Sequence, residues 1–327
     1  MAEGVLIIGE IADGKLAPIT RELIAVGSRI AGEAGGLVSV ALFGSHAEAL
    51  AQSAIEAGGD LIYTFTESLL DDYLTDTWLP AAQMAVEVAD PAVVLLGQSN
   101  VGRDLAPRLA FRLGTDVVMD VTEFSVEGGT VHWTRPCYGG NARAVVKVLT
   151  SPQIATVRSK SFDPLEPQPG RTGDTIPMES GIDPSQVKQR ILGRETAKAE
   201  GVRLEDAAIV VSGGRGLGGP GGFKVLEELA GVLGAAVGAS RAACDLGWYP
   251  PSQQVGLTGK TVSPDLYIAV AISGASQHWA GMANSKNIVA INKDPEATMV
   301  KNARWAIVED YRKVLPPLIE EIKKLKS

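Results

Sequence analysis

Short hydrophobic runs alternate with amphipathic stretches over the first part of the chain. Each run is rich in β-branched residues and bounded by glycine or polar residues, which is typical of buried strands. Strands are therefore predicted at 4–9, 37–43, 61–65 and 92–96.

The segments between these runs have the spacing of helices. The first helix is predicted to begin at Pro18 and to end before the glycine pair at 35–36. The second follows Ser45, which we expect to act as N-cap with Glu48 completing a capping box. A third helix is predicted at 75–88. Strands that alternate with helices of this length predict βαβ units and a mostly parallel sheet.

The pattern changes after a helix predicted at 103–112, with an interruption near Pro107. Three β-rich stretches follow, at 117–126, 130–136 and 144–157, with little helical signal between them. We expect them to be antiparallel or edge strands that finish the same sheet. A proline-rich segment at 163–170 is predicted to lack regular structure, and a polar region follows with a short helical tendency around 187–203.

The alternation starts again beyond this polar region. Strands are predicted at 207–211, 236–240, 266–272, 288–291 and 305–308, and helices at 223–233 and 312–326. We therefore expect two α/β domains, at 1–204 and 205–327.

Composition narrows the classes of function. The net charge of -8 argues against binding to a nucleic-acid backbone, which needs concentrated positive charge. Two distant cysteines predict a reducing compartment, and no apolar run approaches the roughly 18 residues of a membrane helix. The sequence thus predicts a cytoplasmic protein without direct membrane insertion.

Polar residues follow several strands of the second domain. Gly214–Gly219 has the pattern G-x-G-x-x-G after a predicted strand, which brings backbone N–H groups close to a phosphate. The acidic residue expected roughly 20 positions later in a nicotinamide dinucleotide fold is absent, and Ser240 and Arg241 occupy that region.

The other polar residues of the second domain favour the binding of a flat anionic ligand and give no sign of covalent catalysis. Arg215 and Arg241 each follow a predicted strand and could pair with pyrophosphate or lie over a flavin ring. His278 could donate a hydrogen bond to a flavin carbonyl. We find no hydrolytic triad, no pair of catalytic carboxylates and no metal-ligand spacing in the sequence.

The order of small motifs then carries a family resemblance. The chain closely resembles the α subunit of electron transfer flavoprotein, most strongly over 207–319, in the motifs at 212–216, 236–241, 254–260, 266–269, 272–282 and 288–295. A looser match continues through the first domain, where 136–141 also looks like the family.

The resemblance implies two Rossmann-like three-layer domains, the first like adenine-nucleotide hydrolases and the second a DHS-like FAD-binding domain. It implies that FAD is contacted by Arg215, Ser240, Arg241, Gln254, Val255, Gly256, Leu257, Thr258, Ser273, Gly274, Ala275, Ser276, Gln277, His278, Asn292, Asp310 and Tyr311.

Within this set the resemblance gives several residues a place on the cofactor. Thr258 would bond flavin N5, His278 would approach the pyrimidine carbonyl, and Arg241 would cover the ring face. Gly274 and Ala275 would lie near the phosphates, and Asp310 near the adenosine end. Leu257 stands where many members have glutamine, and Tyr311 where leucine is commoner. We therefore expect an altered flavin potential from Leu257 and little effect from Tyr311.

The resemblance also implies partners. A β subunit would carry AMP or a second FAD, and the first domain, with its loop at 97–102, would mainly support assembly. Electrons would come from acyl-CoA or other dehydrogenases of fatty acid β-oxidation and pass to a membrane quinone oxidoreductase. An alternative is the α subunit of an electron-bifurcating, NADH-oxidising complex. A nicotinamide-dependent dehydrogenase and a non-catalytic nucleotide-binding module are further alternatives.

Overall fold

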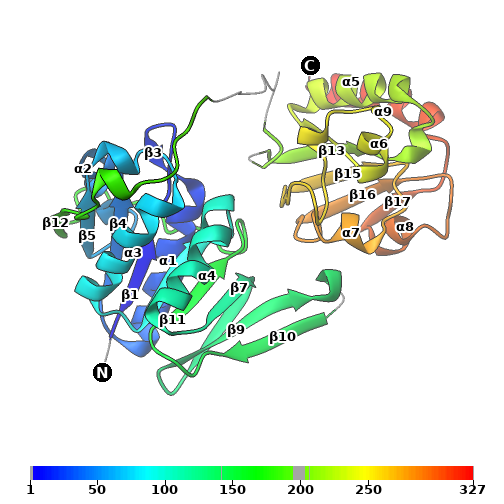
Figure 1. The fold of residues 1–327 in the computed structure, drawn as a ribbon. Helices are drawn as coiled ribbons and strands as arrows, with labels where there is room; N and C mark the ends of the chain where they lie inside the picture. The colour runs from blue at the N-terminus through cyan, green and yellow to red at the C-terminus, as the bar shows by residue number, and fades with distance from the viewer. Residues whose placement is uncertain (1–2, 141, 194–202, 206, 327) are drawn as a thin grey trace. The chain divides into compact units, whose positions relative to one another are not determined.

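The fold of the chain is given by a computed structural model, shown in Figure 1. It describes residues 3–140, 142–193, 203–205 and 207–326. The chain divides into two compact units, one made of residues up to 136 together with 143–194, and the other of 137–142 together with 195–327. Both units are α/β, as the sequence predicts, and each is described here by itself.

The N-terminal unit is built on a parallel sheet whose strands lie in the order β12-β5-β4-β1-β6-β11-β7. The strands are β1 (Val5–Ile8), β4 (Val38–Phe43), β5 (Leu61–Phe65), β6 (Val93–Gly97), β7 (Val117–Val121), β11 (Gln153–Val157) and β12 (Asp174–Met178). A two-stranded hairpin, β2 (Ile11–Ala12) and β3 (Lys15–Leu16), follows β1.

Helices cover both faces of this sheet. One face packs against α1 (Pro18–Ala34) and α2 (Ala47–Glu56), and the other against α3 (Thr75–Ala89) and α4 (Asn100–Leu113). The central strands β1, β4 and β6 are buried on both sides because both faces are covered, which is the usual condition of a parallel sheet. The result is a three-layer unit.

Two local predictions for these helices are wrong. The Ser45 hydroxyl donates to the Asp71 carboxylate at 2.8 Å, and His46, without a side-chain cap, precedes α2, so no capping box forms. Helix α4 continues through Pro107, because its buried face, which includes Leu105 and Leu109, holds the helix together despite one missing N–H donor.

The expected arrangement of the later β-rich stretches also needs correction. β7 and β11 are parallel members of the main sheet. β8 (Glu123–Glu127), β9 (Thr130–Cys137) and β10 (Ala142–Lys147) instead form a separate three-stranded sheet, in which β8 and β9 are antiparallel. β8 alternates between exposed and partly buried positions, which suits a sheet with only one covered face.

Strand β12 was not predicted. It pairs with β5 at the edge of the main sheet, where Pro177 is tolerated because an edge strand leaves N–H groups unpaired. The proline-rich segment at 163–170 lacks helix and strand, as predicted. Of the helical tendency around 187–203, residues 187–193 are irregular, and 194–202 lie outside the described residues.

The C-terminal unit has a parallel sheet in the order β14-β13-β15-β16-β17. Its strands are β13 (Ile209–Gly213), β14 (Ala236–Ala239), β15 (Leu266–Val270), β16 (Asn287–Ile291) and β17 (Trp305–Ile307). One face packs against α5 (Phe223–Leu233), α6 (Arg241–Asp245) and α9 (Tyr311–Lys326), and the other against α7 (Ser276–Trp279), α8 (Thr298–Asn302) and Leu204. No helix in the described part of the chain is long and apolar enough to span a membrane.

Candidate functional site

The candidate site lies along the carboxyl edge of the C-terminal sheet. Strand order reverses between β13 and β15, because β14 follows β13 on one side and the later strands add on the other. Ligands of open α/β sheets bind in the crevice beyond the carboxyl ends of the strands at such a point. Several predicted residues lie within three positions of a strand end: Arg215 after β13, Ser240 and Arg241 after β14, Ser273 after β15, Asn292 after β16 and Asp310 after β17.

The glycine-rich turn after β13 is packed tightly against the end of β15. The Gly214 N–H donates to the Val270 carbonyl at 2.9 Å. A Cβ on Gly214 would lie 2.2 Å from the carbonyl oxygen of Ala271. Close backbone packing therefore requires this glycine, and its presence alone is no sign of a phosphate.

The loop that carries Gln254–Thr258 is fixed to two neighbouring elements. The Val255 N–H donates to the carbonyl of Ala239 at the end of β14, at 2.9 Å. The Leu257 N–H donates to the Gln277 carbonyl in α7 at 2.7 Å. The buried Gln254 amide donates to the Thr258 hydroxyl at 3.1 Å, while Thr258 itself is exposed. These bonds bring Gln254, Leu257, Thr258 and Gln277 together at one place.

His278 lies in α7 and is almost fully buried, with 7% of its surface exposed. Its Nε2 lies 2.9 Å from the hydroxyl of Tyr267 on β15. Among the described residues no hydrogen bond reaches Nδ1, which is also buried. One imidazole nitrogen is thus fixed inside the protein, and the other lacks a full partner.

The protonation states follow from burial. Burial lowers the pKa of His278 to about 4, and the Val255 backbone opposes part of this shift. Burial likewise raises the pKa of Tyr267 far above its usual range, with the Ser212 hydroxyl opposing part of the rise. Both side chains are therefore neutral at neutral pH.

The turn after β15 positions the start of α7. Gly274 has φ 81°, in the left-handed region, and a Cβ there would lie 2.4 Å from the backbone nitrogen of Met299. The Ser273 carbonyl accepts from that same nitrogen at 3.0 Å. Ser273, Ala275 and Ser276 are exposed, so a glycine at 274 lets the chain present polar groups there.

The two predicted cations differ in their surroundings. Arg215 is exposed and has no ion pair among the described residues. Arg241 pairs with Asp245 one helical turn later at 3.3 Å, and both side chains are about two-thirds exposed. An exposed pair of this spacing is worth only about 0.3–0.5 kcal/mol, so the guanidinium can leave it for a stronger anion.

Three other predicted residues already have internal roles. The Asn292 amide donates to the Ile272 carbonyl at 2.9 Å and accepts from the Asp294 N–H at 3.1 Å. The Asp310 carboxylate accepts from the Arg312 N–H at the start of α9. The Tyr311 hydroxyl is buried and donates to the Leu217 carbonyl at 2.9 Å. These bonds hold the carboxyl edge together.

Two residues near His278 were not predicted as part of the site. Tyr267 lies in an otherwise apolar strand, and a hydroxyl buried there needs a partner, which is the signal that could have identified it. Ser212 lies at the end of β13, fully buried, and its hydroxyl has no partner of full geometry within the described residues.

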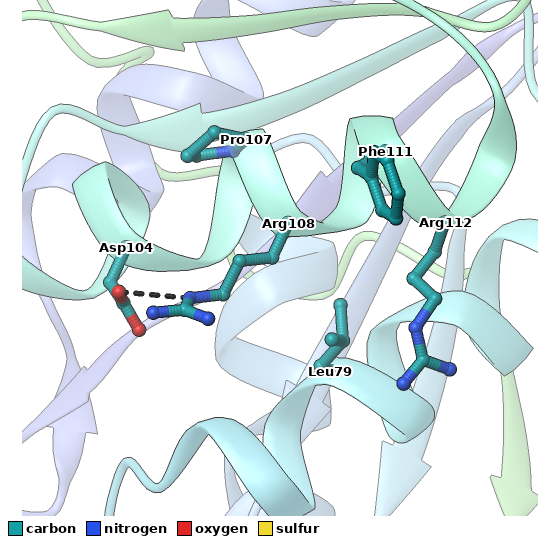
Figure 2. Close-up of a pocket in the computed structure, with 6 residues that line it drawn as sticks. All are labelled: Leu79, Asp104, Pro107, Arg108, Phe111 and Arg112. Atoms are coloured by element: carbon teal, nitrogen blue, oxygen red, sulfur yellow. Dashed lines mark hydrogen bonds and ion pairs between the residues drawn. The ribbon is translucent and has the colours of Figure 1, made fainter.

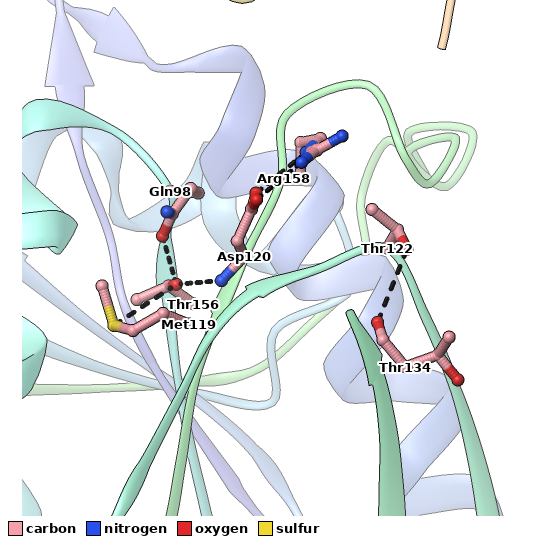
Figure 3. A network of polar contacts seen from close by, with 7 residues as sticks. All are labelled: Gln98, Met119, Asp120, Thr122, Thr134, Thr156 and Arg158. Carbon is pink, nitrogen blue, oxygen red and sulfur yellow. Dashed lines mark hydrogen bonds and ion pairs between the residues drawn. The ribbon is translucent and has the colours of Figure 1, made fainter. Parts of the chain in front are cut away.

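The loop at 97–102 in the N-terminal unit is satisfied within that unit. Ser99 is the N-cap of α4, and its hydroxyl donates to the Glu10 carboxylate at 2.7 Å. Gln98 accepts from the Thr156 hydroxyl, which in turn accepts from the Asp120 N–H at 2.9 Å (Figure 3). Arg158 closes this network with a bidentate ion pair to Asp120. These contacts give the loop a packing role.

A surface groove also lies between α3 and α4 (Figure 2). Exposed Phe111 lies on one side, and Arg108 is paired with Asp104 at 3.0 Å. None of the predicted cofactor residues lies there. Within the described ranges, no group of three or more metal-ligating side chains comes together.

Comparison with known proteins decides the family. Residues 5–179 match the electron transfer flavoprotein domain, and 203–283 match the electron transfer flavoprotein FAD-binding domain. The chain belongs to the electron transfer flavoprotein α-subunit family. It is 45% identical over 328 residues to electron transfer flavoprotein subunit alpha of Bacillus subtilis, covering 99% of each chain. It is 44% identical over 322 residues to the protein of that name from Thermoanaerobacterium thermosaccharolyticum, covering 98% of each. It is also 38% identical to Protein FixB of Clostridium saccharobutylicum, covering 99% of this chain and 98% of that one.

The cofactor of this family is FAD, and the C-terminal unit is its FAD-binding domain. The described residues fit such a group: the buried Nδ1 of His278 lacks a full partner, and exposed hydroxyls and two arginines lie along the same edge. A bound flavin supplies the chemistry of accepting and releasing electrons. The protein's part is to hold the ring, exclude water and set the charge around it.

Proposed function

We propose that the chain is the FAD-carrying α subunit of a heterodimeric electron carrier. The family's α subunits pair with a β subunit, and we propose such a partner here, carrying AMP or a second FAD. FAD would accept electrons from primary dehydrogenases such as acyl-CoA dehydrogenases. A membrane quinone oxidoreductase would receive them. The cytoplasmic location expected from the sequence stays a prediction.

The observation that carries this proposal is the joining of the 254–258 loop to α7. The bond from the Leu257 N–H to the Gln277 carbonyl, at 2.7 Å, places the exposed Thr258 hydroxyl beside the element that holds His278. We propose that Thr258 faces flavin N5 and that His278 faces the pyrimidine end. A domain beginning near residue 205 would then contain every contact to this FAD.

The charges along the edge suit the rest of the dinucleotide. Arg215 and Arg241 supply positive charge after β13 and β14, which favours pyrophosphate and a ring that gains negative charge on reduction. Exposed Ser273, Ala275 and Ser276 would lie along the phosphates. Asn292 and Asp310 would contribute mainly by stabilising the loops at the carboxyl edge of the sheet, since their polar groups already form hydrogen bonds within the protein.

Co-expression with a β subunit tests the proposal. The purified complex should be a yellow heterodimer with flavin absorbance, and acyl-CoA with its dehydrogenase should bleach it. A complex that stays colourless after FAD addition would refute the proposal. One FAD with AMP per heterodimer would support the simple carrier. Two FAD with reduction by NADH would instead favour the bifurcating alternative.

A further inference from the structure

Tyr267 and Ser212 form a buried polar pair behind His278. Val210 and Tyr267 are partners in the register of β13 and β15, and both pack in the same core cluster. Ser212, two residues after Val210, therefore lies on the same face as Tyr267. Tyr267 and Ser212 are both fully buried. A buried hydroxyl group costs free energy unless it is hydrogen-bonded, and the bond that the Tyr267 hydroxyl makes is to Nε2 of His278.

The bond between Tyr267 and His278 can be ordered in two ways. Either the Tyr267 hydroxyl donates to Nε2 and the imidazole proton is on Nδ1, or Nε2 carries the proton and donates to the Tyr267 oxygen. A phenol hydroxyl is a stronger hydrogen-bond donor than a neutral imidazole N–H, and the unprotonated imidazole nitrogen is the stronger acceptor. At 2.9 Å from Nε2, the Tyr267 hydroxyl is therefore expected to donate to this nitrogen, which favours the first order.

We propose that Tyr267 is a positioning residue of the flavin site, whose hydroxyl donates to Nε2 of His278 and so fixes the neutral tautomer with its proton on Nδ1. This rests on the proposed contact between His278 and FAD. With the proton on Nδ1, His278 has a hydrogen-bond donor at the nitrogen that has no full partner among the described residues. The other tautomer would present a bare nitrogen there and would repel a carbonyl oxygen of the cofactor.

The test uses the full chain in complex with its β subunit, labelled with ¹⁵N-histidine. This chain has three histidines, and a His278→Asn complex identifies the His278 signals by difference. In the unmodified complex, Nδ1 should be protonated and Nε2 unprotonated at pH 6 to 8. A protonated Nε2 in the unmodified complex would overturn the proposal. This part of the test needs no Tyr267 variant, so it can be read even if such a variant fails to fold.

Tyr267→Phe removes the hydroxyl and keeps the ring. The His278 proton should then be shared between the two nitrogens, FAD should bind roughly three- to tenfold more weakly, and the flavin reduction potential should fall, because a neutral hydrogen-bond donor is lost. Tyr249→Phe is the matched control. Tyr249 lies in the same unit and its hydroxyl interacts with Glu227, so this variant should change neither the tautomer nor the flavin.

The outcomes separate the two proposals. If His278 in the Tyr267→Phe complex kept the same tautomer as in the unmodified complex, the proposed role of Tyr267 would be overturned. A changed tautomer with unchanged FAD affinity and potential would also overturn it, since Tyr267 would then order His278 without effect on the cofactor. Failure of the proposed function would be visible earlier, as an unmodified complex that binds no FAD.

Discussion

The backbone N–H of Leu257 is bonded to the carbonyl of Gln277, while the Leu257 side chain is 61% exposed. The main chain at this position joins the 254–258 loop to α7, and the side chain contributes little to the core. If FAD lies beside this loop as proposed, a substitution of Leu257 should change the surroundings of the cofactor without disturbing the fold.

Leu257→Gln should raise the flavin reduction potential. An amide donor near the ring favours negative charge on it, and a hydrogen bond worth about 1 kcal/mol corresponds to roughly 20 mV for a two-electron couple. Stability should change by less than about 0.5 kcal/mol, because the side chain is exposed. Redox titration of the complex measures the potential. Leu325→Gln, at an 86% exposed position in α9, is the control and should leave it unchanged. Equal potentials in all three proteins would contradict the prediction.

Gly274→Ala should destabilise the C-terminal unit by more than about 2 kcal/mol. The left-handed backbone costs a side chain about 1–2 kcal/mol, and the new Cβ would meet the Met299 backbone at 2.4 Å. Urea unfolding and FAD content report the effect. Gly231→Ala in α5 is the control: its Cβ has open space, so stability should stay the same or rise by up to about 1 kcal/mol. A Gly274→Ala chain as stable as the parent would show that the turn can relax.

Glu22→Gln should make the stability of the N-terminal unit less dependent on pH. Glu22 on α1 is buried and accepts from the Lys160 N–H at 2.6 Å. Burial raises the pKa of Glu22 to about 7 from an ordinary value of 4.5, with the Lys160 backbone bond opposing the rise. The folded state therefore holds this proton more tightly than the unfolded state does. The contribution of Glu22 to stability is therefore fully present below about pH 4.5 and is lost as the pH rises through 7.

Glutamine keeps the acceptor oxygen but never ionises. The variant should match the parent near pH 4.5 and exceed it at pH 8 by up to about 3 kcal/mol, since each pKa unit is worth about 1.36 kcal/mol. Hydrogen exchange of amides in α1 and β1 measures this locally. A constant difference at both pH values would mean that ionisation of Glu22 is not its cause.

Arg241→Ala should bind FAD more weakly, by roughly three- to tenfold, and lower the flavin potential, because a cation over the ring stabilises its reduced form. Loss of the exposed pair with Asp245 should cost at most about 0.5 kcal/mol of stability. Asp245→Asn is the matched variant. It frees the guanidinium from its carboxylate, so the potential should stay the same or rise. Equal falls in both variants would indicate that the ion pair, and not the cation, affects the flavin.

Local pattern in the sequence determined the two α/β units and the positions of most of their elements. The spacing of hydrophobic residues, the glycines at turns and the polar residues after strands can all be read from neighbouring residues. Arg215, Ser240 and Ser273 could therefore be expected at one edge of a parallel sheet. The order of the small motifs also indicated the family and its FAD.

Contacts between distant residues had to be decided by the tertiary structure. Ser45 bonds Asp71 instead of capping its helix, and β12 joins an edge that no local pattern marks. The neutral state of His278 likewise comes from burial beside Tyr267, a strand residue. Burial and hydrogen-bond partners arise only when elements far apart in the chain pack together, and residue type and spacing do not specify them.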